Sequence, residues 1–243
     1  GLAMHTSISA PLPGSALRAA PPFVWERLSD LPDPVGLKGA YAGMSNGWVL
    51  LAGGSNFPVP RAAGGTKAFA DRIYVRSVEV ADAPWREVSE RLSFGFAEGA
   101  AVTVGDGVIA IGGQTAKGPV ADVFLLRMDR GGTKVERLPL PSLPAPCANA
   151  AAVFLNGHVY VAGGEQDAQG MAHFWRLNVA AALANPSGVS WETLPTWPGP
   201  RRFGAMMAVL AQVGREQVFL FGGRREAARP ITIDEYLAGA YRY

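Results

Sequence analysis

Charged and polar side chains recur in this sequence next to paired glycines and at the start of apolar runs. The candidates for chemistry are Lys38, Asn56, Phe57, Gln114, Glu165, Arg201, Arg202 and Arg224. Arginine and lysine can bind a carboxylate, arginine through two parallel hydrogen bonds. A glutamate such as Glu165 can give or take a proton, and amide side chains can bind hydroxyl groups. These residue types would serve carboxylate binding and proton transfer.

Each candidate also has a structural interpretation, which the sequence leaves open. Solvent exposure, capping or packing within a loop would account for most of these side chains equally well. Arg201 and Arg202 are the best candidates for a carboxylate clamp. They open an apolar run that is predicted to be an innermost strand, and from there a guanidinium would point at the central axis of the fold. Glu165 and Arg202 are the predicted catalytic pair, and the other six are predicted to bind the substrate.

Four apolar runs, each ended by two glycines, organise the whole chain. The first is VLLAGG, Val49 to Gly54, and close copies end at Gly113, Gly164 and Gly223. Their separation of about 50 to 60 residues is the period of a kelch-type propeller blade. The repeat therefore predicts an all-β fold made of propeller blades.

Each repeat unit contains signals for four antiparallel strands. Small residues form the inner strand, and turn residues at Asn46-Gly47, Asp106-Gly107 and Asn156-Gly157 lead into the apolar run. A third strand follows each long loop, and a Trp-x-x-Leu pattern such as that at Trp191 marks the outer strand. The inner strands are expected in 95–101 and 148–152 of the second and third units. The predicted blades are 36–90, 94–140, 147–194 and an incomplete 202–243 without an outer strand.

The segment 23–31 is predicted to be a lone outer strand that completes another blade, behind a flexible leader at 1–22. Either it closes a four-bladed ring directly, or the ring is larger and further blades are missing. We favour the larger ring, because the chain starts at Gly1 and Tyr243 falls inside a predicted strand. The chain is therefore expected to be a fragment.

The sequence around GAYAGMSNGWVLLAGGSNFP and FAEGAAVTVGDGVIAIGGQTAKGPVADVFLL resembles the cyclically permuted branch of the sialic acid mutarotases, also called N-acetylneuraminate epimerases. The resemblance covers about Phe23 to Tyr243. It implies a six-bladed propeller, of which this chain holds about four blades. The family's Gly-Glu-x-x-Pro-Gly-x-Arg element, whose Glu and Arg are associated with catalysis, is absent, and Gly164-Glu165 lacks its Pro and Arg.

The resemblance implies an isomerase that interconverts the anomers of N-acetylneuraminic acid or a related sugar acid. Such a reaction opens a cyclic hemiketal by acid–base chemistry and needs no metal or organic cofactor. The alternative is a non-enzymatic kelch scaffold that binds a protein on its loop face, since one fold hosts many functions. An exposed apolar patch on the loop face, with no polar cluster in the central channel of the propeller, would favour the scaffold.

Composition limits the partners further. The net charge is +2, which gives no electrostatic reason to expect nucleic acid, and no apolar run is long enough to cross a membrane. The single cysteine, Cys147, leaves the compartment open. Family resemblance implies a periplasmic or secreted protein, although no signal peptide is visible.

Overall fold

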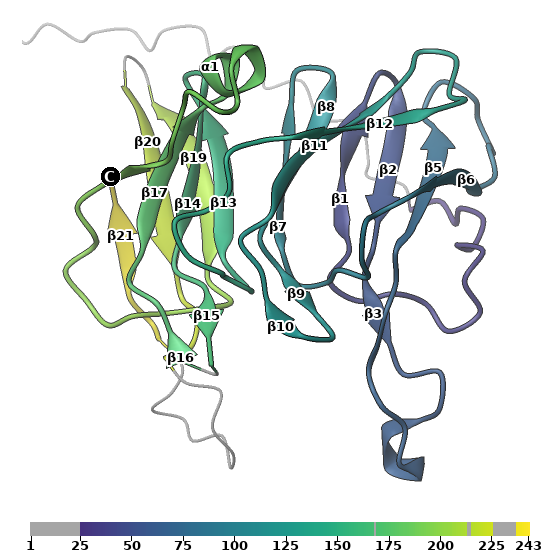
Figure 1. Cartoon of the computed structure of the whole chain (residues 1–243), viewed down its shortest axis with the longest axis horizontal. Coiled ribbons are helices and arrows are strands. Elements are labelled where there is room, and N and C mark those ends of the chain that lie inside the picture. The colour runs from purple at the N-terminus through teal and green to yellow at the C-terminus, as the bar shows by residue number, and fades with distance from the viewer. Residues whose placement is uncertain (1–24, 168, 213–214, 226–236) are drawn as a thin grey trace, which may run out of the picture.

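The computed structural model describes residues 25–167, 169–212, 215–225 and 237–243. Four antiparallel sheets lie side by side in chain order (Figure 1). The first contains β1 (Tyr41–Ser45), β2 (Trp48–Ala52), β5 (Arg72–Ser77) and β6 (Arg86–Arg91). The second contains β7 (Ala100–Val104), β8 (Gly107–Ile111), β11 (Val123–Met128) and β12 (Val135–Pro139). The third contains β13 (Ala151–Leu155), β14 (His158–Ala162), β17 (Phe174–Asn178) and β18 (Glu192–Thr193). The fourth has three strands in the described residues, β19 (Met206–Gln212), β20 (Arg215–Phe221) and β21 (Ala240–Arg242).

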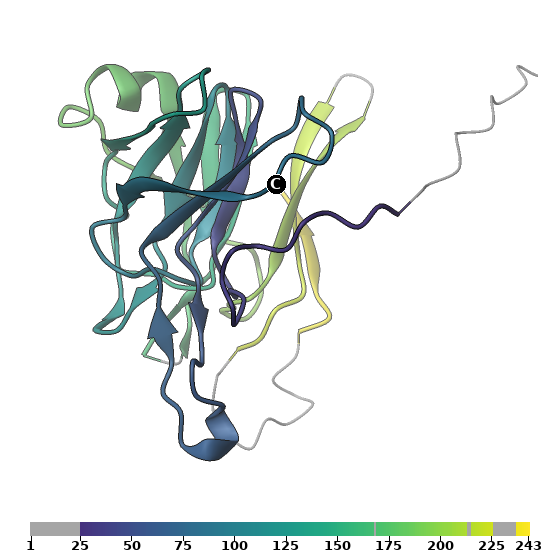
Figure 2. The ribbon, with the colours of Figure 1, turned by 90° about the vertical axis from the view of Figure 1, so that its right-hand side faces the viewer.

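Short hairpins extend from the double-glycine ends of the first three sheets, at the lower edge of Figure 1. They are β3 (Ser55–Asn56) with β4 (Ala68–Phe69), β9 (Gln114–Thr115) with β10 (Gly118–Pro119), and β15 (Glu165–Gln166) with β16 (Gln169–Gly170). The loop between β3 and β4 includes the 3-10 turn η1 (Arg61–Ala63) and projects well beyond the sheets (Figure 2). The helix α1 (Val179–Ala184) follows β17 and is capped by Asn178, whose side chain accepts a hydrogen bond from the Ala181 N–H.

The predicted hairpin turns are formed in the first and third sheets. Asn46 and Asn156 have left-handed φ angles of 48° and 49°, each followed by a glycine. In the second sheet the prediction was off by one residue, because the turn is Gly105-Asp106 and Gly107 already belongs to β8. Gly105 has φ 55°, so the glycine needed for positive φ stands at the first central position of the turn.

The innermost strands β1, β7, β13 and β19 pack against one another in succession. Their small residues allow this close approach, as the sequence predicts. The second and third inner strands begin at Ala100 and Ala151, later than predicted, because the residues before them make single bridges and a left-handed turn. Three apolar clusters fill the spaces between neighbouring sheets, and the described sheets do not close into a ring.

The double glycines connect each sheet to the next. The second glycine donates its N–H to a carbonyl of the following sheet, from Gly54 to Phe96 at 2.7 Å and from Gly113 to Cys147 at 2.8 Å. A Cβ on the first glycine would overlap that same carbonyl. The motif therefore recurs because each sheet must approach its neighbour closely at this point.

The outer strand predicted over 23–31 is not formed in its described part, 25–31. These residues run away from the sheets (Figure 2), and the Trp25 side chain is 98% exposed. A strand needs a partner strand to satisfy its backbone, and none of the described sheets pairs with this segment. Residues 1–24, which include the predicted leader, lie outside the described residues. No helix in the described part of the chain has the length and hydropathy to cross a bilayer.

Candidate functional site

The double-glycine end of the inner strands gathers most of the candidate residues. There, the residue three positions before each inner strand forms a single bridge with the residue after the double glycine. The bridged pairs are Lys38 with Ser55, Ala97 with Gln114, Ala148 with Glu165, and Phe203 with Arg224. Gln114, Glu165 and Arg224 thus occupy equivalent positions in consecutive sheets.

One residue further on, the main chain of each sheet is joined to the next by a hydrogen bond. We call these four positions the rung residues: Gly39, Glu98, Asn149 and Gly204. The Glu98 N–H donates to the Gly39 carbonyl at 2.7 Å, Asn149 to Glu98 at 2.7 Å, and Gly204 to Asn149 at 2.8 Å. All four have left-handed φ angles, of 69°, 60°, 51° and 59°. The rungs therefore place Glu98 and Asn149 at the double-glycine end of the inner strands, which we call the mouth.

Glu98 is the anion of a cluster with two lysines. Its Oε1 atom lies 2.8 Å from the Lys67 Nζ and 3.4 Å from the Lys38 Nζ, and its side chain is only 11% exposed. Burial alone raises the pKa of Glu98, but the two lysines outweigh burial and hold the pKa below its usual range. Glu98 is therefore ionised at neutral pH.

Glu165 is the second carboxylate at the mouth, and it has a different environment. Asn149 Nδ2 donates to Glu165 Oε1 at 2.5 Å. Burial raises the pKa of Glu165, and the charge of Glu98 raises it further, while Asn149, Arg224 and Lys67 act in the opposite direction. The net result is a pKa above the usual value for a glutamate, with burial as the largest cause.

A cavity of about 630 Å³ lies beside this cluster and is lined in part by the loop between β3 and β4. Three predicted binding residues, Lys38, Asn56 and Phe57, line it together. The other lining residues are Val35, Gly36, Leu37, Ser55, Arg61, Lys67 and Glu98. Three cations against one carboxylate leave the cavity with a local excess of positive charge, which favours an anionic occupant.

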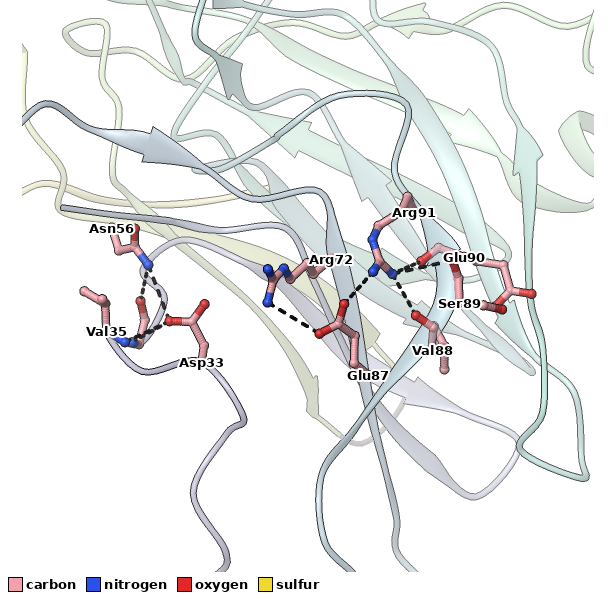
Figure 3. Close-up of polar contacts among 10 residues, drawn as sticks. Asp33, Val35, Asn56, Arg72, Glu87, Val88, Ser89, Glu90 and Arg91 are labelled. Atoms are coloured by element: carbon pink, nitrogen blue, oxygen red, sulfur yellow. Dashed lines mark hydrogen bonds and ion pairs between the residues drawn. The ribbon is translucent and has the colours of Figure 1, made fainter. Parts of the chain in front are cut away.

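Two of these side chains are fixed by their neighbours. Asn56 Nδ2 donates to the Gly36 carbonyl at 3.0 Å and lies 3.4 Å from Asp33 Oδ1, as Figure 3 shows. The Arg61 guanidinium lies over the Phe57 ring at 5.4 Å. A separate group in Figure 3, Arg72 and Arg91 around Glu87, belongs to the outer strands and not to the cavity.

Arg202 lies elsewhere, between the third and fourth sheets. It is fully buried, and its Nη1 donates to the Gly222 carbonyl at 2.6 Å. Its guanidinium faces the rings of Tyr241 at 4.9 Å and Trp197 at 5.5 Å. The structure therefore does not bring Arg202 to Glu165, its predicted catalytic partner, and Arg201 is exposed.

The remaining predicted residues are at or near the mouth. Arg224 lies over the Phe203 ring at 5.5 Å and is close enough to lower the pKa of Glu165. Gln114 is half-buried and exchanges two main-chain hydrogen bonds with Ala97. No group of three or more His, Cys, Asp and Glu side chains that could hold a metal ion occurs among the described residues.

Sequence reasoning missed Glu98, Asn149 and Lys67. One signal was available: aligning the first three repeats on their double glycines places Glu98 and Asn149 where the first repeat has Gly39. A charged or amide side chain at a position that otherwise needs glycine indicates a functional constraint. Nothing in the sequence distinguishes Lys67 from other loop lysines.

The arrangement of the sheets defines a kelch-type β-propeller, because successive four-stranded antiparallel sheets pack through their innermost strands. A solved structure titled "Structure of YjhT" has this fold, with a TM-score of 0.66 and 11% identity over 83% of this chain and 63% of that chain.

The sequence comparisons are more specific. Residues 17–135 match the family model described as N-acetylneuraminate epimerase. The N-acetylneuraminate epimerase of Brucella suis is 36% identical over 124 residues, which is 46% of this chain and 32% of that protein. That of Vibrio cholerae is 35% identical over 106 residues, 37% of this chain and 26% of that protein. The resemblance seen in the sequence is thus confirmed over this segment, and the chain spans about a third of the length of these curated relatives.

Proposed function

We propose that this chain is part of a carbohydrate mutarotase that interconverts the anomers of N-acetylneuraminic acid or a related sugar acid. The observation that carries the proposal is the cavity with excess positive charge, which Glu98 lines, together with the opposite pKa shifts of Glu98 and Glu165. This cavity lies within the segment that matches the epimerase family.

In this proposal the cavity binds the sugar acid through its charge and its polar groups. Lys38 and Arg61 attract the carboxylate, the Asn56 amide binds a hydroxyl, and the Phe57 ring covers an apolar face of the sugar. Lys67 is already held by Glu98 and keeps that carboxylate ionised. These roles account for three of the residues predicted to bind substrate.

Glu165 is the proposed proton-transfer group. Opening the hemiketal requires removal of the proton from the anomeric hydroxyl and delivery of a proton to the ring oxygen. Burial raises the pKa of this half-buried glutamate above its usual value, so its acid form is a better match to proton delivery than that of an exposed glutamate. The sequence also predicts a catalytic role for Arg202. Because Arg202 is buried between two sheets, away from the cavity, this role is a separate proposal.

The test is the rate at which the anomeric signals of freshly dissolved N-acetylneuraminic acid reach equilibrium, followed by NMR. We expect acceleration by the 243-residue chain or by a longer protein that contains it, and a loss of about 10²-fold or more in the variant Glu165→Gln. Glu192→Gln is the matched control, because Glu192 pairs with Arg176 on an outer strand. If neither protein accelerates mutarotation, the proposed function is wrong. Arg202→Ala in the same assay tests the predicted role of that residue.

We also propose that the complete ring contains further blades, about six in total, and that residues 23–31 supply an outer strand to one of them. The exposed Trp25 and the three described strands of the fourth sheet support this proposal. Trp25 would then be buried against a neighbouring blade in a longer protein. Its fluorescence, isolated by comparison with Trp25→Phe, should shift to shorter wavelength there, and an unshifted emission would contradict the proposal.

A further inference from the structure

The four rung residues have the same backbone conformation but two kinds of side chain. The first and fourth blades use glycine, which adopts positive φ without strain. The second and third use Glu98 and Asn149 at φ 60° and 51°. Asparagine tolerates this region, but glutamate has no such tendency, so its presence needs an explanation from what the side chain contacts.

We propose that Asn149 and Glu98 are positioning residues for Glu165: Asn149 holds one of its carboxylate oxygens, and Glu98 places a second carboxylate charge beside it. This inference rests on the proposed role of Glu165 in proton transfer. It adds that two adjacent rungs determine the orientation and protonation of that group.

The contact made by Asn149 is short and well fixed. Its Nδ2 atom donates to Glu165 Oε1 at 2.5 Å, and its main chain is held on both sides, by its N–H to the Glu98 carbonyl and by the Gly204 N–H to its own carbonyl. The bridge between Ala148 and Glu165 fixes the two backbones relative to each other. The backbones of Asn149 and Glu165 are therefore both fixed, and the Asn149 amide is held next to the Glu165 carboxylate.

Glu98 acts on Glu165 through charge. It is kept ionised by Lys67 and Lys38, and a carboxylate that remains charged makes it harder to ionise a second one nearby. The charged and titratable groups that face Glu165 are Glu98 and Lys67 from the first two blades, the Cys147 thiol of the third, and Arg224 of the fourth. Burial and Glu98 raise the pKa of Glu165, while Asn149, Arg224 and Lys67 lower it.

The two rung residues thus act in opposite directions. The Asn149 amide hydrogen bond favours the ionised form of Glu165, because it donates to the carboxylate. The Glu98 charge favours the protonated form. The pKa of Glu165 therefore depends on both rung residues, and burial acts in the same direction as Glu98.

Glycine variants provide the experiment, because glycine already occupies the rung position in two blades of the same chain. The side-chain carboxyl of Glu165 is followed by NMR in the 243-residue chain labelled with 13C-glutamate, and its signal is assigned with Glu165→Gln. In Asn149→Gly we expect the titration midpoint of Glu165 to rise, because a donor to the carboxylate is lost. In Glu98→Gly we expect it to fall, because a like charge is lost and the two lysines are released.

Asn156→Gly is the matched control, since Asn156 also has positive φ but stands in a hairpin turn of the third blade. It should leave the midpoint unchanged. The proposal is overturned if both rung variants leave the Glu165 titration where it was, or if they shift it in the same direction.

The titration needs no sugar, so its outcome is independent of the proposed activity. If the midpoints move as expected and mutarotation is absent, the proposed function fails and the positioning role stands. If mutarotation is present, its pH–rate profile should move in the same direction as the NMR midpoint in each variant. A purely structural role would lower the rate at every pH without moving the profile.

Discussion

The Tyr41 hydroxyl tests whether individual contacts hold neighbouring blades together. Tyr41 lies on the innermost strand of the first blade, is fully buried, and donates its hydroxyl hydrogen bond to the Gly112 carbonyl of the second blade. The substitution Tyr41→Phe removes only this hydroxyl. The ring and its contacts with Phe96 and Phe124 remain, so no large cavity forms.

The expected cost follows from what is left behind. Without the hydroxyl, the Gly112 carbonyl loses the one hydrogen bond it accepts in the described structure and cannot reach water through the buried ring. Leaving a buried acceptor unsatisfied costs about 1–3 kcal/mol. We therefore expect Tyr41→Phe to lower the free energy of unfolding by about 2 kcal/mol.

Tyr74→Phe is the matched control. Tyr74 is also fully buried, but its hydroxyl makes no hydrogen bond of good geometry in the described part of the chain. Its one polar interaction there is a weak one with the exposed Arg72 guanidinium, whose pKa it raises. Removing a buried hydroxyl that lacks a partner should be neutral or stabilising.

Urea unfolding of both variants, followed by tryptophan fluorescence, gives the comparison. At equal slopes, the midpoint should fall for Tyr41→Phe and stay or rise for Tyr74→Phe. The reasoning is refuted if the two substitutions have equal effects or if Tyr74→Phe is the more destabilising.

Three further predictions follow from buried contacts. Gly99→Ala should destabilise the chain by about 1–3 kcal/mol in the same assay, because its Cβ would overlap the Tyr41 ring, and a neutral result would show that the blades can move apart. Burial raises the pKa of Cys147 to about 12, whereas an unfolded thiol ionises near ~8.5. The unfolded chain therefore releases its proton first, so stability should fall as pH rises above about 8.5, and Cys147→Ala should flatten this slope. Because Lys67 and Lys38 hold the pKa of Glu98 below its usual value, the stability that Glu98 contributes is present above its unfolded pKa and is lost as pH falls through the folded value. Lys67→Met should reduce this loss of stability at low pH, and an acid-unfolding curve that does not change would contradict the prediction.

The strand order could be predicted because it depends on short patterns within one repeat. A double glycine, a turn with Asn46-Gly47 and an apolar run each specify local backbone geometry. At Asp106-Gly107 the predicted turn was wrong by one residue, because the preceding Gly105 takes the positive φ. The outer strand over 23–31 stays a prediction, since a strand depends on a partner strand that its own sequence does not show.

The site was only partly predictable because it is assembled between blades. Glu165 was singled out because it directly follows a double glycine, and its catalytic role stays a prediction. Its neighbours Glu98 and Asn149 come from contacts that no local pattern reveals. Arg202 was placed at the channel because it opens a strand, but its position in the repeat is that of the buried Phe96 and Cys147, which pack between blades.

The rung hydrogen bonds use only main-chain atoms, so the joint between two blades does not depend on which side chain stands at the rung. Any residue that accepts a left-handed backbone can be exchanged there while the connection persists. Residues at this end of the propeller can therefore change their chemistry one blade at a time, and a new activity can arise at the mouth without rebuilding the sheets beneath it.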